Sequence, residues 1–187
     1  MSTLRIFKDN DFGQALLCTD DGVEIKHQLE EVGIRFERWD TQSLPVTATQ
    51  DDILSAYADE VARLKSESGF TTADVVSLTS DHPQKQEFRK KFLDEHRHSE
   101  DEVRFFVRGQ GVFYLHLDDK VYAVQCCQND LISVPNGTKH WFDMGPEPDF
   151  TCIRLFTNPE GWVAQFTGDE IASQCPRFET LLNGSYN

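Results

Sequence analysis

The chain has 187 residues, the size of one domain, and its 14 Phe residues and 39% hydrophobic content predict a packed core. Its formal net charge of −14, with no basic segment to offset it, argues against nucleic acid or an anionic membrane surface as a partner. No segment approaches the roughly 20 apolar residues of a membrane span, and residues 1–8 hold no apolar run of signal-peptide length, so we expect a cytoplasmic protein.

The first half of the chain, residues 1–94, alternates strand-like and helical patterns. Apolar and β-branched runs predict four strands, at Leu4–Phe7, Ala15–Thr19, Ile34–Trp39 and Val75–Thr79. Apolar residues at helical spacing predict three helices, at Asp21–Val32, Asp51–Ser68 and Pro83–Asp94. Thr49 is the expected N-cap of the second helix, and Gly69 is its expected stop.

From Val103 onward the pattern changes to short strands with tight turns. Five strands are predicted, at Val103–Val107, Val112–Leu117, Val121–Cys126, Leu131–Val134 and Phe150–Phe156. The glycines of Gly109-Gln110-Gly111 indicate a hairpin between the first two. Short strands without helices between them predict a sandwich or barrel over residues 95–157. The tail, 158–187, carries a short helix near Glu170, and we expect residues 1–187 to form a single domain.

Three of the six histidines lie in two compact clusters that resemble a metal site. In an extended segment, residues two apart project from the same face, so His96 and His98 can reach one point, and Glu102 has the same parity. His140 would arrive from another strand, as a small barrel allows. Three neutral imidazoles and a carboxylate suit Fe, Ni, Mn or Co, whereas structural zinc favours a closed site with thiolates. The alternative is an acidic, histidine-containing loop that faces solvent.

The remaining histidines and the cysteines give no second site. His27, His82 and His116 have no partners at ligand spacing, and His116, between Leu115 and Leu117, is expected at the surface or in the barrel lumen. The sequence has five cysteines, an odd number, and no two of them stand at C-x-x-C spacing. This argues against a disulfide framework and against a zinc ribbon. With no long amphipathic helix or heptad seam, we expect a monomer.

Two motifs carry a family resemblance. The spacing His96-x-His98-x3-Glu102-x6-Gly109 resembles the first cupin motif, and Pro135-x-Gly137-x2-His140 resembles the second. The chain departs from that pattern at two positions, Asn129 and Met144, where glycine and asparagine are usual. Three longer parts of the sequence closely resemble the bacterial branch of the acireductone dioxygenases: FLDEHRHSEDEVRFFVRGQGVFYLHL, NDLISVPNGTKHWFDMG and RLFTNPEGWVAQFTGDEIA. Two earlier parts also resemble that family, VGIRFERW and DVVSLTSDHPQKQEFRKKFLDEH, so the match covers nearly the whole chain.

The resemblance implies both a fold and a reaction. The fold is mainly β with N-terminal helices: a cupin double-stranded β-helix, or jelly-roll barrel, preceded by an α/β N-terminal section. The substrates are O2 and the acireductone 1,2-dihydroxy-3-keto-5-methylthiopentene of methionine salvage. One Fe(II) or Ni(II) per chain is implied. The Fe(II) form gives formate and 2-keto-4-methylthiobutyrate, and the Ni(II) form gives formate, carbon monoxide and 3-methylthiopropionate.

Two arginines are candidate partners for the anionic substrate. Arg104 shares parity with Glu102, and a guanidinium group suits an enediolate oxygen. Arg154 lies in an otherwise apolar strand, where its charge is costly without an anionic partner. In the alternative reading, either arginine pairs only with a structural carboxylate.

Further site residues are suggested around these groups. The resemblance indicates an apolar pocket for the methylthio tail, and its walls would be Phe92, Phe105, Phe142 and Trp162. The alternative is that these aromatic residues are plain core. Glu95 and Asp101 flank the ligands and are expected either to orient imidazoles from outside the coordination sphere or to be solvated acids.

Three other functions stay open at this point. They are a cupin oxygenase acting on a different enediol or diketone, a non-enzymatic metal-binding cupin, and a sugar-phosphate isomerase of cupin fold that does not use O2. Oxygen uptake with the acireductone would discriminate among them.

Overall fold

In the part of the chain that the structure describes, eleven strands form the framework. A computed structural model describes residues 1–158 and 163–184. The strands are β1 (Thr3–Lys8), β2 (Leu17–Thr19), β3 (Arg35–Arg38), β4 (Thr72–Leu78), β5 (His96–Arg97), β6 (Glu102–Leu117), β7 (Lys120–Cys127), β8 (Asp130–Val134), β9 (Lys139–Asp143), β10 (Phe150–Phe156) and β11 (Gln165–Phe166). The helices are α1 (Gly22–Glu30), α2 (Gln50–Ala56), α3 (Ala58–Ser68), α4 (Lys85–Phe92), α5 (Ile171–Gln174) and α6 (Phe178–Leu182).

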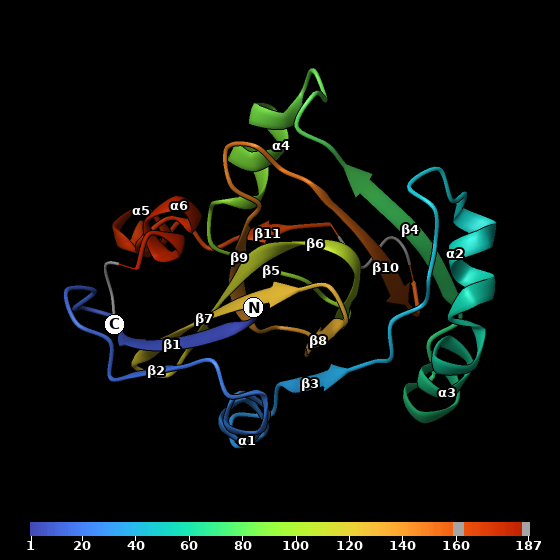
Figure 1. Cartoon of the computed structure of the whole chain (residues 1–187). Helices are drawn as coiled ribbons and strands as arrows, with labels where there is room; N and C mark the ends of the chain where they lie inside the picture. The colour runs from blue at the N-terminus through green and yellow to red at the C-terminus, as the bar shows by residue number, and fades with distance from the viewer. Residues whose placement is uncertain (159–162, 185–187) are drawn as a thin grey trace.

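Strand β6 lies at the centre and belongs to two sheets (Figure 1). Residues 102–109 pair with β8 and β10, in a sheet of order β4-β10-β6-β8-β3. Residues 110–117 pair with β7 and β9, in a sheet of order β11-β5-β9-β6-β7-β1-β2. The two sheets curve around a common interior as a barrel. The mainly β fold with N-terminal helices predicted from the sequence is confirmed.

The N-terminal strands are part of these sheets. β1 pairs with β7, β3 pairs with β8 and β4 pairs with β10, each antiparallel. Helices α2 and α3 cover one end of the molecule, and α5 and α6 lie at the opposite end (Figure 1). The α/β N-terminal section expected before the barrel therefore supplies flanking strands of the barrel's own sheets.

One predicted helix is two helices in the structure. Residues 51–68 were expected to be continuous, but α2 ends and α3 begins around Tyr57, whose φ of −111° and ψ of 24° leave the helical region. The Tyr57 ring is fully buried and packs edge-on against Phe105, at 4.8 Å between ring centroids. The predicted ends are confirmed: Thr49 forms a capping box with Asp52, and Gly69 adopts the left-handed conformation.

The predicted hairpin at residues 109–111 is wrong, because β6 runs through it. Gly109 has a φ of +78°, and a Cβ there would overlap the carbonyl oxygen of Asp149. A Cβ at Gly111 would overlap the Phe142 ring. The two glycines thus allow close approach of neighbouring segments where β6 passes from one sheet to the other, and they do not form a turn.

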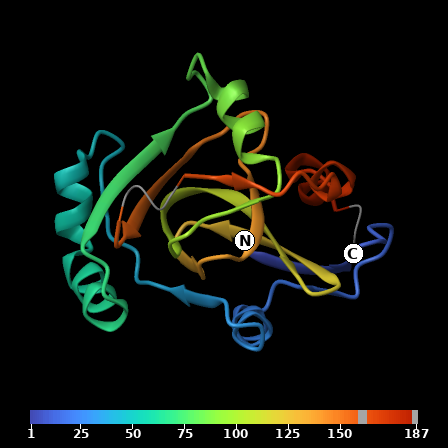
Figure 2. The same cartoon turned by 180° about the vertical axis from the view of Figure 1, so that it is seen from behind.

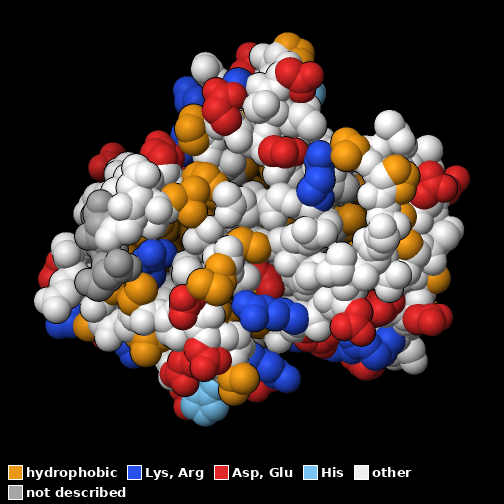
Figure 3. Space-filling view, in the orientation of Figure 1, with side chains coloured by type: hydrophobic (Ala, Val, Ile, Leu, Met, Phe, Trp, Pro, Cys, Tyr) orange, Lys and Arg blue, Asp and Glu red, His pale blue; other side chains and the backbone are white. Residues whose placement is uncertain are grey.

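The core consists of three groups of buried side chains. One fills the barrel and includes Phe106, Phe113 and Phe142; a second lies under α2 and α3; a third lies under α5 and α6. On the face drawn in Figure 3, acidic side chains are spread over the surface with basic ones between them. Within the described residues, no helix is long and apolar enough to cross a membrane. All five cysteines are free.

Candidate metal centre

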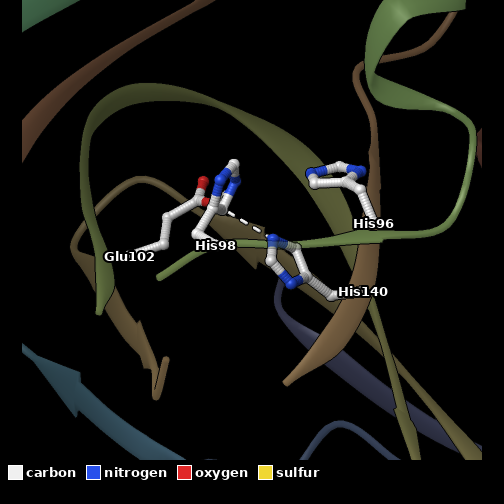
Figure 4. A group of neighbouring side chains, drawn as sticks. All are labelled: His96, His98, Glu102 and His140. Carbon is white, nitrogen blue, oxygen red and sulfur yellow. Dashed lines mark hydrogen bonds and ion pairs between the residues drawn. The ribbon is translucent and has the colours of Figure 1, made fainter. Parts of the chain in front are cut away.

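Four buried side chains converge inside the barrel (Figure 4). His96 is on β5, His98 follows it, Glu102 begins β6 and His140 is on β9. Backbone pairing of His96 with His140 brings the two chain segments together. One ligand atom from each of the four residues lies within 4.8 Å of the others. The exposed fraction is 8% for His98 and 3% or less for the other three residues. The structure thus brings together the four residues that the sequence proposed as ligands.

Hydrogen bonds fix how the imidazoles point. The Nδ1 of His96 is 2.7 Å from the carbonyl oxygen of Asp94, and the Nδ1 of His140 is 2.8 Å from that of Thr138. A carbonyl only accepts, so each Nδ1 carries a proton and donates it, which leaves Nε2 as the nitrogen that would bind a metal. The Nε2 atoms of His140 and His98 lie 3.0 and 3.1 Å from one Glu102 oxygen.

The electrostatics of the cluster favour binding of a cation. Burial, with the neighbouring His140, lowers the pKa of His96 to about 4, so this imidazole is neutral at pH 7. Burial opposes ionisation of Glu102, but the charge of Arg104 and contacts with two imidazoles hold the pKa of its carboxyl well below the ordinary value. When each ligand atom is about 2.1 Å from a bound ion, neighbouring ligand atoms lie about 3 Å apart. The Nε2 atoms of His98 and His140 lie at about this distance from the Glu102 oxygen. These residues fit a divalent transition metal.

Arg104 lies on the same face of β6 as Glu102. Its Nε donates to the Oε1 atom of Glu102 at 2.7 Å, and its side chain is buried. The guanidinium carbon lies 4.9 Å from the centre of the Phe142 ring and 5.8 Å from that of Phe92. Aromatic faces and one carboxylate therefore hold the positive charge beside the metal ligands.

A cavity of about 480 Å³ opens beside the cluster. Its walls are formed by the four candidate ligands together with Lys91, Phe92, Arg104, Phe142, Arg154, Val163, Ala164 and Phe166. The sequence did not single out Lys91 or the 163–166 segment, because no local pattern shows that β11 returns to the metal ligands. Trp162, the fourth predicted wall residue, lies outside the described residues.

The second arginine has a carboxylate partner. Arg154 donates from Nε and Nη2 to both oxygens of Asp74, at 2.8 and 2.5 Å, across the β10–β4 pair. It also lines the cavity. The structural pairing left open by the sequence is thus present, and the same side chain still faces the cavity.

Phe105 does not line the cavity, contrary to the prediction. Its ring stacks on Trp39 at 4.3 Å between centroids and packs against Tyr57. The reason is the alternation of side chains along β6: Arg104 points into the barrel, so Phe105 points to the core under α2 and α3.

The sequence left open whether the flanking acids orient imidazoles or are solvated, and the hydrogen bonds described for them go to other partners. The carboxylate of Asp101 accepts from the backbone N–H of Asn136 at 2.8 Å, in the loop that leads to His140. The carboxylate of Glu95 is bound to His116 and Thr167. His116 was assigned no role, and the structure gives it a buried partner 21 residues away. No spacing in the sequence signals such a long-range contact.

Comparisons with known proteins agree with one another. A model of the ARD/ARD' family matches residues 3–164. An acireductone dioxygenase of Hahella chejuensis is 76% identical, over 97% of this chain and 98% of its own length. One from Marinobacter nauticus is 66% identical, over 99% of this chain and 100% of its own length.

A solved structure extends the likeness to three dimensions. It is an acireductone dioxygenase from Bacillus anthracis with a cadmium ion in its active centre. The two chains are 31% identical with a TM-score of 0.79, covering 89% of this chain and 98% of the other.

Proposed function

The chain belongs to the ARD/ARD' family and is a metal-dependent dioxygenase, and we propose that its substrate is the acireductone 1,2-dihydroxy-3-keto-5-methylthiopentene of methionine salvage. One observation carries the proposal. Three imidazoles and a carboxylate share a cavity with a buried arginine and two aromatic walls. The cavity of about 480 Å³ is within the range of about 300–1,000 Å³ that small-molecule sites occupy.

The chemistry of the substrate suits the side chains that line the cavity. An acireductone is an enediol conjugated to a ketone, so it ionises readily and presents two adjacent oxygens. When bound, the metal supplies a Lewis-acid centre for those oxygens. In the proposal, Arg104 stabilises negative charge on the enediolate and Arg154 offers a second cationic contact. Phe92 and Phe142 provide apolar walls for the methylthio tail and keep water from it.

The ligands we propose are His96, His98, Glu102 and His140, holding one Fe(II) or Ni(II). Nitrogen and oxygen donors of this kind bind both ions, so the ligand set does not exclude either of them. In the proposal the Fe(II) form gives 2-keto-4-methylthiobutyrate and formate. The Ni(II) form gives 3-methylthiopropionate, formate and carbon monoxide.

We also propose that the whole chain is a single domain. β1, β3 and β4 pair with β7, β8 and β10, so the N-terminal half and the barrel share their sheets.

The test is metal stripping, reconstitution with Fe(II) or Ni(II), and assay with the acireductone. Oxygen uptake is measured together with chromatography of the acids and headspace carbon monoxide, on protein of verified metal content. We expect carbon monoxide only from the Ni(II) form. Identical products from both forms would refute the metal-dependent product choice, and no oxygen uptake by either form would refute the assignment of the substrate.

A further inference from the structure

A buried carboxylate beside the metal ligands has no role in the chemistry described so far. Glu95 precedes His96, and its side chain is fully buried. One oxygen is 2.5 Å from the Nδ1 of His116, and the other accepts from the hydroxyl of Thr167 at 2.7 Å. Burial of a carboxylate without hydrogen-bond partners costs free energy, so these two contacts stabilise Glu95 in its buried position.

The contact with Thr167 attaches the C-terminal strand to the barrel. Thr167 directly follows β11, and its backbone N–H also donates to the carbonyl oxygen of Glu95, at 3.1 Å. β11 has two residues and, within the described residues, pairs with β5 alone, through Gln165 with Arg97 and Phe166 with His96. Figure 2 shows this last strand, in red-orange, running across the barrel toward the C-terminal helices. A strand this short has little stability of its own, so side-chain contacts at its end decide how firmly it is held.

The contact with His116 anchors the same carboxylate to the central strand. His116 is on β6, where the residue before it, Leu115, pairs with His140. The imidazole is 8% exposed, and its Nε2 lies 3.8 Å from a carboxylate oxygen of Asp9. Because a carboxylate only accepts, the Nδ1–H of His116 donates to Glu95. Three segments far apart in the chain, around residues 95, 116 and 167, therefore meet at one carboxylate.

The strand that this carboxylate holds is a wall of the reaction cavity. Phe166 of β11 and two residues just before the strand, Val163 and Ala164, line the cavity, and the Phe166 ring lies edge-on to His96 at 5.9 Å between centroids. Val163 is 70% exposed and Phe166 is 56% exposed, so this wall faces solvent on its other side. If β11 moved away, the cavity would open to water at the metal ligands.

We propose that Glu95, His116 and Thr167 are positioning residues, which hold β11 against β5 as the outer wall of the cavity and so keep the substrate bound and shielded from water. This inference rests on the proposed dioxygenase function for its kinetic consequence. The attachment of β11 itself can be measured without turnover.

The decisive variant is Thr167→Val, which removes one hydroxyl and keeps the shape of the side chain. A hydrogen bond to a charged group is lost, so we expect KM for the acireductone to rise about 10-fold or more, with a smaller change in kcat and unchanged metal content. Amide hydrogen exchange of the holoenzyme, followed by mass spectrometry, should become faster in peptides covering residues 163–169. Thr167→Ser should restore both properties, because serine retains the donor.

A matched control is Thr151→Val. It removes a comparable hydroxyl, bonded to Ser77 at 2.9 Å between β10 and β4, that lies outside this cavity. KM and exchange in residues 163–169 should stay at wild-type values. His116→Leu should reproduce the effects of Thr167→Val, because it removes the other partner of Glu95.

Four outcomes would overturn the inference. For Thr167→Val, the first is unchanged kinetics and exchange, and the second is altered kinetics with unchanged exchange. The third is failure of Thr167→Ser to restore either property. The fourth is loss of metal in Thr167→Val, which would mean that Glu95 acts on His96 rather than on β11. If wild-type protein does not turn over the acireductone, the substrate assignment fails, and the exchange comparison alone then decides whether the three residues hold β11.

Discussion

Removal of Arg89 tests how the strand carrying His140 is held in place. Arg89, on α4, donates from Nε and Nη2 to the two oxygens of Asp143, at 2.8 and 3.0 Å, and Asp143 ends β9. The carboxylate is 0% exposed and the arginine side chain is 16% exposed. Two backbone donors, the N–H groups of Gly145 and Phe178, also bind it, at 2.9 and 3.0 Å.

The expected cost of Arg89→Met follows from these contacts. Removing one partner of a buried pair typically costs about 3–5 kcal/mol, because a charge remains in the interior without its counterion. Since the two backbone donors remain at Asp143, we expect a smaller cost, about 2–4 kcal/mol in the free energy of unfolding. For a chain of this length that corresponds to a fall in Tm of about 4–16 °C.

The assay is thermal and urea denaturation of Arg89→Met beside a matched control. Lys26→Met breaks an exposed pair with Glu30, 3.5 Å long with both side chains more than half exposed, and its Tm should stay near the wild-type value. In an Asp143→Asn background the same Arg89→Met change should cost much less, because no buried charge is left behind. An equal cost in both backgrounds, or a wild-type Tm for Arg89→Met, would refute the reasoning.

Three further predictions concern the site and the fold. His98→Ala should lose most of the bound metal by elemental analysis, while His27→Ala, at an exposed helix position, should retain it. Arg104→Lys should keep only part of the turnover measured by oxygen uptake, because an ammonium group is a point donor and not a fork. Burial disfavours the ionised form of Glu37, yet hydrogen bonds from Arg63, Trp39 and Arg35 lower the pKa of its carboxyl from 4.5 to about 2. The Glu37→Gln variant should therefore be less stable than the wild type at pH 7. That difference, measured by urea denaturation, should be complete above about pH 4.5 and shrink as the pH falls toward 2.

The candidate ligands could be predicted from the sequence because their arrangement is mostly local. His96, His98 and Glu102 share parity in an extended segment, and that parity survives whatever the segment packs against. Only His140 required a second strand, which the short-strand pattern already implied. The helix boundaries at Thr49 and Gly69 were predictable for the same reason, since capping depends on neighbouring residues.

The errors arose where distant segments decide the outcome. Glycines at 109 and 111 suit a hairpin, but here they accommodate Asp149 and the Phe142 ring, which the local sequence does not reveal. The bond between His116 and Glu95 likewise exists only once β9 has paired with β5 on one side and with β6 on the other. Phe105 is a different case: the parity that places Arg104 with Glu102 already puts Phe105 on the opposite face, so the sequence alone could have excluded it from the cavity.

The double membership of β6 also bears on how the chain is made. All four of its pairing partners, β7 to β10, are synthesised after it, and the last of them ends at Phe156. During translation β6 therefore leaves the ribosome with both edges unpaired, and it stays so on at least one edge until residues 150–156 are available. Its apolar side chains, among them Phe105, Phe106 and Phe113, are then exposed together. We infer that premature chain termination before residue 150 leaves an aggregation-prone fragment, and that chaperone capture is strongest at that stage of synthesis.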